Sequence, residues 1–241
     1  DNKIGLIPKS YIDSVLNVDI NEETEKRRDK NKMRMLLKSL ARNESSIVGN
    51  KTIIKDIEEY ENGTELLSSR DTVIDYLDVL DRLHLIENQE AYGENYRSPN
   101  RVGKSPKRHL TDPSLSCACL GLTTEKLLKD LNTFGFMFEA LVERDLRIYM
   151  DYLDGHLYHF RDNVTGLEVD SILEFSGGDY AAVVIKLGYN QVDEAKKSLL
   201  NFYDNMVKKP AFMCVIVGKC SAVVRDPETG IYIVPITALK P

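Results

Sequence analysis

The sequence lacks the features that mark membrane and secreted proteins. No stretch approaches the run of about 18 apolar residues that a membrane-spanning helix needs. The first residues show no basic region followed by an apolar run, so no signal peptide is predicted. A starting methionine is also missing, which favours a fragment of a longer polypeptide. These absences predict a cytoplasmic protein with no membrane partner.

Cysteine pairs and an excess of positive charge are missing as well. The four cysteines form no CxxC pair, and the four histidines form no ligand cluster with them, so no structural zinc site is predicted. Reduced thiols of a cytosolic protein are the expectation. The net charge of −6 and the pI of 5.4 argue against nonspecific coating of nucleic acid, although a local basic patch remains compatible with them.

An intact ATP-binding loop is absent. Gly103-Lys104-Ser105 resembles the end of a P-loop, but the position five residues before Gly103 holds Ser98 in place of glycine. Pro106 follows where a helix should begin. No ATPase motif is therefore predicted in this chain.

What is present begins with a helical part. Apolar residues recur at helical spacing in three segments, and Ser68 or Ser69 is placed to cap the third. A short β-like run at 83–86 and a polar loop follow. The expected helices cover residues 33–41, 52–60 and about 70–80. Three helices, a strand and a loop predict a winged-helix-like domain over residues 1–108, with the third helix as the recognition element.

The loop carries a concentrated basic segment in an acidic chain. Its cations are Arg97, Arg101, Lys104, Lys107 and Arg108, with Tyr96 beside them. One hypothesis is a wing that contacts the phosphates of nucleic acid, DNA in preference to RNA. The alternatives are a solvated linker and a wing that docks on a partner protein. The recognition helix opposes the first hypothesis, because its aspartates repel phosphate.

The second part, residues 109–241, has a different pattern. Residues 105–112 mark the expected boundary, and Asp112 with Pro113 predicts a helix start. Further helices are expected over 133–152 and 191–208. Strands are expected at 157–161, 167–175, 180–187, 211–217, 222–225 and 231–234. The order αβββαβ with extra strands predicts an α/β fold, a mixed sheet flanked by helices.

Three charges lie where apolar residues are expected. Glu139 is alone in an apolar helix, Asp170 lies within a strand, and Lys186 ends the apolar run 180–185. A lone buried charge is costly unless it is paired or binds a metal, so these three side chains are expected to meet. One hypothesis is a Mg²⁺ site in which the carboxylates hold the metal and the lysine orients water. The other is a structural ion pair of Lys186 with Asp170.

Four segments together resemble a known family. They are residues 105–115, 134–142, 166–170 and 185–188. As a set they resemble the domain of unknown function that follows an AAA-type ATPase domain in many bacterial and archaeal proteins, and the resemblance extends from about residue 11 to the end. It implies a winged helix followed by a PD-(D/E)xK, restriction-endonuclease-like module, with an ATPase domain of the same polypeptide as partner.

The resemblance also implies roles for individual residues. Glu139 matches the acid of the first helix, Asp170 the metal-binding aspartate and Lys186 the lysine of (D/E)xK, with Mg²⁺ held by Glu139 and Asp170. Gln191 matches a polar residue that often follows the motif. One position departs from the pattern, because the acid expected two residues before Lys186 is Val184. Glu168 shares a strand face with Asp170 and is the alternative ligand.

Two functions follow from these observations. The first is a nucleic-acid-associated module of an AAA-type ATPase that is nuclease-like in fold, has an incomplete metal site, and binds or regulates. The second is an active Mg²⁺-dependent endonuclease that uses Glu139, Asp170 and Lys186.

Overall fold

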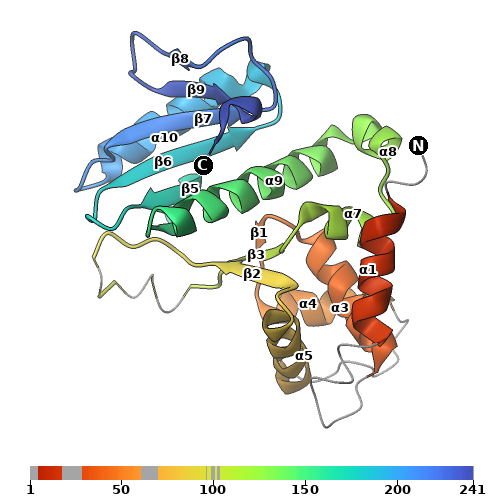
Figure 1. Cartoon of the computed structure of the whole chain (residues 1–241). Coiled ribbons are helices and arrows are strands. Elements are labelled where there is room, and N and C mark those ends of the chain that lie inside the picture. Colours follow the sequence, from red (N-terminus) through yellow and green to blue (C-terminus); the bar gives the residue numbers. More distant parts are fainter. Residues whose placement is uncertain are drawn as a thin grey trace. The chain divides into compact units, whose positions relative to one another are not determined.

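The structure, a computed structural model, describes residues 5–17, 29–60, 70–95, 97–98, 101 and 104–240, and of residues 58–60 the backbone alone. The chain forms two compact units, each interrupted in sequence. The first unit comprises Asp1–Asn88 and Lys107–Thr133, and the second comprises Gln89–Pro106 and Phe134–Pro241. Figure 1 shows their elements in chain order. Among the described residues, no helix has the length and apolar character needed to cross a membrane.

The first unit is built mainly of helices around one apolar core. Its helices are α1 (Leu6–Asn17), α3 (Lys30–Arg42), α4 (Asn50–Tyr60), α5 (Arg70–Arg82), α7 (Pro113–Leu120) and α8 (Thr124–Lys129). Its short strands are β1 (Ser46–Ile47), β2 (Ile86–Gln89) and β3 (Lys107–Leu110), which form a sheet in the order β1-β3-β2. β2 leads from this unit into the second at Gln89.

The expected apolar positions of the first unit are confirmed as its core. Met33 and Leu36 of α3 are fully buried, as are Val73 and Leu80 of α5. They recur at helical spacing, so each helix turns one apolar face inward. The proposed caps Ser68 and Ser69, and Tyr96 of the basic loop, lie outside the described residues.

Several elements of the first unit differ from the expectation, among them the short strands β1 and β3, which were not predicted. Helix α1 was not predicted, and it adds Ile12, Val15 and Leu16 to the core. The strand expected at 83–86 begins only at Ile86, because the turn that follows α5 contains a left-handed residue, His84, with φ of 52°. The Leu85 amide donates to the Leu80 carbonyl, which is the hydrogen bond of a Schellman motif.

The second unit contains one mixed sheet. Its strands are β4 (His156–Arg161), β5 (Glu168–Glu174), β6 (Tyr180–Lys186), β7 (Phe212–Val217), β8 (Val224–Arg225) and β9 (Tyr232–Pro235). They lie in the order β4-β5-β6-β7-β9-β8. β5 pairs antiparallel with β4 and β6, whereas β7 pairs parallel with β6 and β9. The predicted mixed sheet is confirmed.

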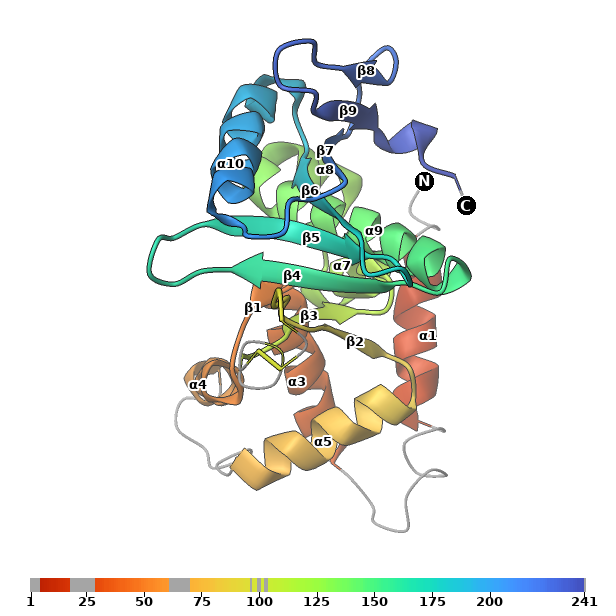
Figure 2. The same ribbon diagram turned by 90° about the vertical axis from the view of Figure 1, so that its left-hand side faces the viewer.

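One long helix covers each face of this sheet (Figure 2). They are α9 (Leu131–Tyr152), whose first turn belongs to the first unit, and α10 (Val192–Asn205). Side chains alternate along β6, so Val183 joins the core under α9 and Val184 joins the core under α10. Because both faces are covered, β6 is an almost continuous apolar run.

The division into units differs from the expected single boundary between residues 108 and 109. Residues 109–133 belong to the first unit, because Leu110 of β3 and Leu115 of α7 are part of its core. Residues 89–106 belong to the second unit, where Ala91 bridges His159 of β4. The predicted start of α7 is confirmed: Asp112 caps the helix by accepting from the Ser114 amide, and Pro113 follows it.

Candidate functional site

A polar pocket opens in the second unit where β5 and β6 separate. Their antiparallel pairing runs from Glu174 opposite Tyr180 to Ser171 opposite Val183 and then ends. Beyond that point Asp170 Oδ2 accepts a hydrogen bond of 2.7 Å from the Ile185 amide. The pocket has a volume of about 260 Å³ and is lined by Thr165, Gly166, Leu167, Glu168, Asp170, Val184, Lys186, Ser198 and Asn201.

Two of the predicted site residues line this pocket. Lys186 shares a face of β6 with Val184. Asp170 lies where the register of β5 with β4 shifts, between Val169 and Ile172, which both pack under α10. Ile172 and Val184 both pack in the core under α10, so the pocket lies on that face. Both charged side chains are half-buried. The structure therefore brings Asp170 and Lys186 together, while their chemical roles stay predictions.

Val184 occupies the position of the missing acid. It lines the pocket together with Asp170 and Lys186, and only 3% of it is exposed. Its methyl groups offer no lone pair to a cation, so this part of the wall is apolar. The acid Glu168 also lines the pocket, but it faces solvent and pairs with Arg161 at 3.6 Å.

Glu139 comes from the helix that covers the other face. It is half-buried on α9 and is not among the residues that line the pocket. One turn later on α9, Glu143 is fully buried and accepts from Ser171 Oγ at 3.3 Å. Sequence reasoning missed Glu143, although its spacing of four residues from Glu139 places both carboxylates on one side of the helix.

The donor set of the pocket does not fit a divalent cation well. Within the described ranges, no group of three or more His, Cys, Asp and Glu side chains is placed to hold a metal ion. One oxygen of Asp170 already accepts from a backbone amide. Gln191 lies outside the pocket, where its Oε1 accepts from the Gly188 amide at 3.3 Å.

The five basic residues of the loop are divided between the units. Lys107 and Arg108 belong to the first, where only 2% of Lys107 is exposed and Arg108 donates to the Val48 carbonyl. Arg97 and Lys104 belong to the second; Arg97 is exposed, and Lys104 donates to the Arg161 carbonyl at 2.6 Å. Contact with nucleic acid stays a prediction, and buried Lys107 is poorly placed for it.

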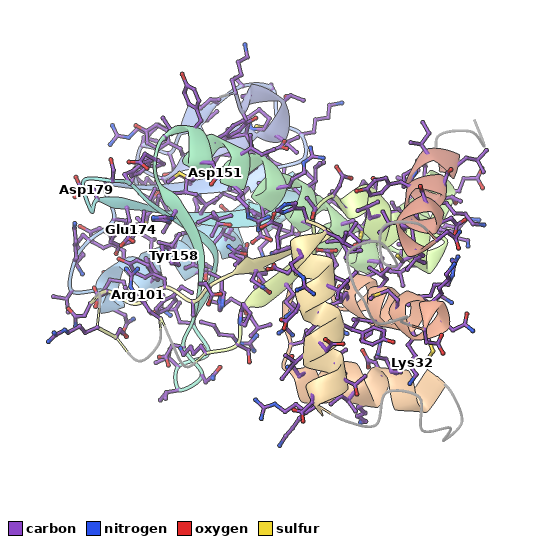
Figure 3. All side chains as sticks on the ribbon, turned by 60° about the horizontal axis from the view of Figure 1, so that its bottom comes forward. Lys32, Arg101, Asp151, Tyr158, Glu174 and Asp179 are labelled. Atoms are coloured by element: carbon purple, nitrogen blue, oxygen red, sulfur yellow. The ribbon has the colours of Figure 1, made fainter. Side chains whose placement is uncertain are left out.

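Arg101 is fixed by a cluster within the second unit (Figure 3). Its guanidinium contacts both carboxylate oxygens of Glu174, at 2.8 and 3.3 Å, and donates to the Gly93 carbonyl. It also lies over the rings of Tyr92 and Tyr158, 5.3 and 4.9 Å from their centres. Burial and the nearby Glu174 charge raise the pKa of Tyr158. The cluster holds the loop against β4 and β5, which sequence reasoning did not reveal.

Two family models match the chain. Residues 2–126 match a family described as a domain of unknown function, DUF8612, and this is more than half of the 241 residues. The chain belongs to this family. Residues 134–239 match a second domain of unknown function, DUF4143, a domain that commonly lies C-terminal to AAA ATPases. No curated protein matches the chain.

A solved structure with some similarity is a half-complex from a tetradecameric assembly of Thermococcus gammatolerans McrB AAA+ hexamers with bound McrC. The matching chain is 10% identical, and the match covers 87% of this chain and 72% of that chain. The TM-score is 0.30, which is too low to support any inference about fold or function.

Proposed function

We propose that this chain is the C-terminal, nucleic-acid-associated part of an AAA-type ATPase, and that its second unit is a nuclease-like module that binds or regulates without cutting. The match of residues 134–239 to a domain common after AAA ATPases supports the first statement. The order α9, β4, β5, β6, α10, β7, with Asp170 and Lys186 in one pocket, supports a PD-(D/E)xK ancestry. Val184 carries the noncatalytic proposal, because a valine in the wall cannot bind a metal.

The first unit supports a winged-helix assignment. Its elements follow the order α3, β1, α4, α5, β2, β3, and the strands form a three-stranded sheet. The α5 helix in the recognition position exposes Asp71, Asp75 and Asp78. Carboxylates on this face repel a phosphate backbone. We therefore assign α5 to protein contacts rather than to the DNA major groove.

Titration calorimetry with Mg²⁺ and Mn²⁺, combined with cleavage assays on single- and double-stranded DNA and RNA, tests the noncatalytic proposal. We expect neither metal-binding heat nor cleavage. Cleavage that Lys186→Ala abolishes would overturn the proposal and establish the endonuclease alternative. Lys219→Ala, which removes an exposed lysine of the same unit, is the matched control.

A gain-of-function variant tests the role of Val184 directly. Val184→Glu introduces a carboxylate at the pocket wall beside Asp170 and Lys186. We expect this variant to bind Mn²⁺ where the parent chain does not, because two carboxylates are a common protein contribution to such sites. Circular dichroism establishes that the variant is folded. A folded variant without Mn²⁺ binding would show that the pocket is not a lapsed metal site.

The endonuclease remains the second candidate because Asp170 and Lys186 share one pocket. In that case Asp170 with Glu168 or Glu139 would hold the metal. The variants Asp170→Asn and Glu139→Gln would then abolish both metal binding and cleavage. Asp204→Asn, at an exposed aspartate of α10, would leave both unchanged.

A further inference from the structure

Helix α3 carries an unusual concentration of positive charge for this acidic chain. Between its first and last residues it holds five basic side chains and no acidic one. Four of them, Lys30, Arg34, Lys38 and Arg42, follow one another at intervals of four residues, and all are exposed. Residues at this interval are neighbours on one face of a helix. α3 therefore presents a basic row along about 20 Å of helix, at a rise of about 1.5 Å per residue.

A groove lies beside this row within the first unit. It has a volume of about 390 Å³ and is lined by Met35, Lys38, Ser39, Arg42, Asp56, Ile57 and Leu120. These residues come from α3, α4 and α7, and α3 packs against each of the other two helices. Ile57 is buried, and Met35 and Leu120 are half-buried, so the floor is apolar. We call it the α3 groove.

Among the described residues that line the α3 groove, the exposed charge at the rim is positive. Asp56 accepts hydrogen bonds from Ser39 Oγ and Asn43 Nδ2 and pairs with Arg42, and its side chain is only 10% exposed. The Arg42 side chain is 64% exposed. A guanidinium has five N–H donors, so Arg42 can receive a second carboxylate while it holds Asp56. Lys38 lines the same rim and is exposed.

We propose that the α3 groove docks an acidic amphipathic helix of a partner protein. An apolar floor takes the leucine-like side chains of such a helix at spacings i, i+4 and i+7, while Lys38 and Arg42 pair with its acidic flanks. The rest of the basic row continues beyond the groove, where Lys30 donates to Asn17 Oδ1 and Arg34 pairs with Asp13 of α1. Nucleic acid fits less well, because the apolar floor offers no hydrogen bond or charge to phosphate or sugar.

Fluorescence anisotropy on the full chain tests this docking. The probe is a fluorescein-labelled 15-residue synthetic helix with leucines at i, i+4 and i+7 and glutamates on both flanks. We expect it to bind, and we expect Lys38→Glu and Arg42→Gln each to weaken binding by about tenfold. Lys129→Glu on α8 makes the same charge change as Lys38→Glu at an exposed site outside the groove and should leave the affinity within about twofold.

Further measurements separate this occupant from others. Amide chemical-shift changes on titration should cluster on α3, α4 and α7. A probe of the same composition with the leucine spacing scrambled should bind at least about tenfold more weakly. The proposal fails if the probe does not bind at millimolar concentration, if the scrambled probe binds equally well, or if the shifts lie elsewhere. It also fails if a 15-base-pair DNA duplex displaces the probe and loses its own binding in Lys38→Glu.

Discussion

Glu44 is a carboxylate almost without solvent contact, because only 1% of the residue is exposed. It accepts hydrogen bonds from Ser116 Oγ and from the Leu110 amide, and it lies 3.1 Å from His109 Nδ1. These partners belong to β3 and α7, so one side chain connects three parts of the first unit. A buried polar group is tolerated only when its hydrogen bonds are made.

Glu44→Gln should lower the free energy of unfolding by about 1–3 kcal/mol. The glutamine side chain keeps the shape of glutamate but has one accepting oxygen, whereas the groups around Glu44 contact two carboxylate oxygens. Urea unfolding followed by circular dichroism measures the change. Glu125→Gln, at an exposed carboxylate of α8, is the control and should change stability by less than about 0.5 kcal/mol. Equal midpoints for Glu44→Gln and the parent chain would contradict the stabilising role.

Arg101 gives a second prediction at the scale of the residue. Arg101→Met should destabilise the second unit by about 3 kcal/mol, because it leaves the Glu174 carboxylate, 11% exposed, without its bidentate partner. Lys209→Met is the matched control, since Lys209 also lies over a tyrosine, Tyr203, but at an exposed position. Lys209→Met should lower the free energy of unfolding by less than about 1 kcal/mol. If Arg101→Met and Lys209→Met lost equal stability in urea unfolding, the pair of Arg101 with Glu174 would add nothing to stability.

At the scale of the element, the stability of α5 depends on the backbone conformation just after its C-terminal end. His84 adopts φ of 52°, a conformation that glycine reaches without strain. His84→Gly should therefore leave stability equal or raise it by up to about 1 kcal/mol, whereas His84→Val should lower it. Thermal unfolding of both variants measures the effect. Destabilisation by glycine as large as that by valine would mean that the imidazole itself stabilises the helix end.

The connection of α10 to the turn before β9 predicts a pH dependence. Lys196 Nζ donates to Asp226 Oδ2 at 2.7 Å, and the amides of Glu228 and Thr229 donate to Oδ1. The hydrogen bond from Lys196, followed by that from Thr229, lowers the pKa of Asp226. A lowered carboxyl pKa contributes stability above the unfolded value of about 3.9, and this contribution is lost as the pH falls through the native value.

Asp226→Asn should thus lower the unfolding midpoint at pH 7, and its difference from the parent chain should shrink as the pH falls from about 5 towards 2. Thermal unfolding across this range measures the difference. Asp204→Asn, at an exposed site of α10 for which no such contact with Lys196 exists among the described residues, should show no such trend. A pH-independent difference for Asp226→Asn would contradict the assignment.

At the scale of the whole molecule, the cations of the basic loop differ in how far solvent reaches them. In the basic loop, Arg97 is exposed and Lys104 is partly so, whereas Lys107 is buried. If the chain contacts DNA through this loop, Arg97→Ala with Lys104→Ala should reduce the salt slope of log K by about 1.8, which corresponds to two phosphates. Lys129→Ala with Lys219→Ala is the control pair. An unchanged slope would exclude the loop as the contact.

The elements could be predicted from the sequence wherever a strong apolar period and a clear stop signal coincide. Residues 180–186 form β6 and residues 192–205 form α10, close to the expected 180–187 and 191–208, and Asp112 caps α7. Glu139, Asp170 and Lys186 were expected to meet; Asp170 and Lys186 line one pocket, and Glu139 is not among its lining residues. The late start of β2 was missed, because its cause is the left-handed conformation of His84, which no periodicity encodes.

Local sequence therefore determined most of the elements, because helix and strand periods and caps act over a few residues. Only the tertiary structure decided which charged side chains lie close together. It placed Lys186 with Asp170 on one face, Glu139 on the helix that covers the other, and Lys107 inside the first unit. The physical reason is that burial and pairing are properties of segments distant in sequence. The pocket that holds Asp170 and Lys186 and the α3 groove are both products of that long-range packing.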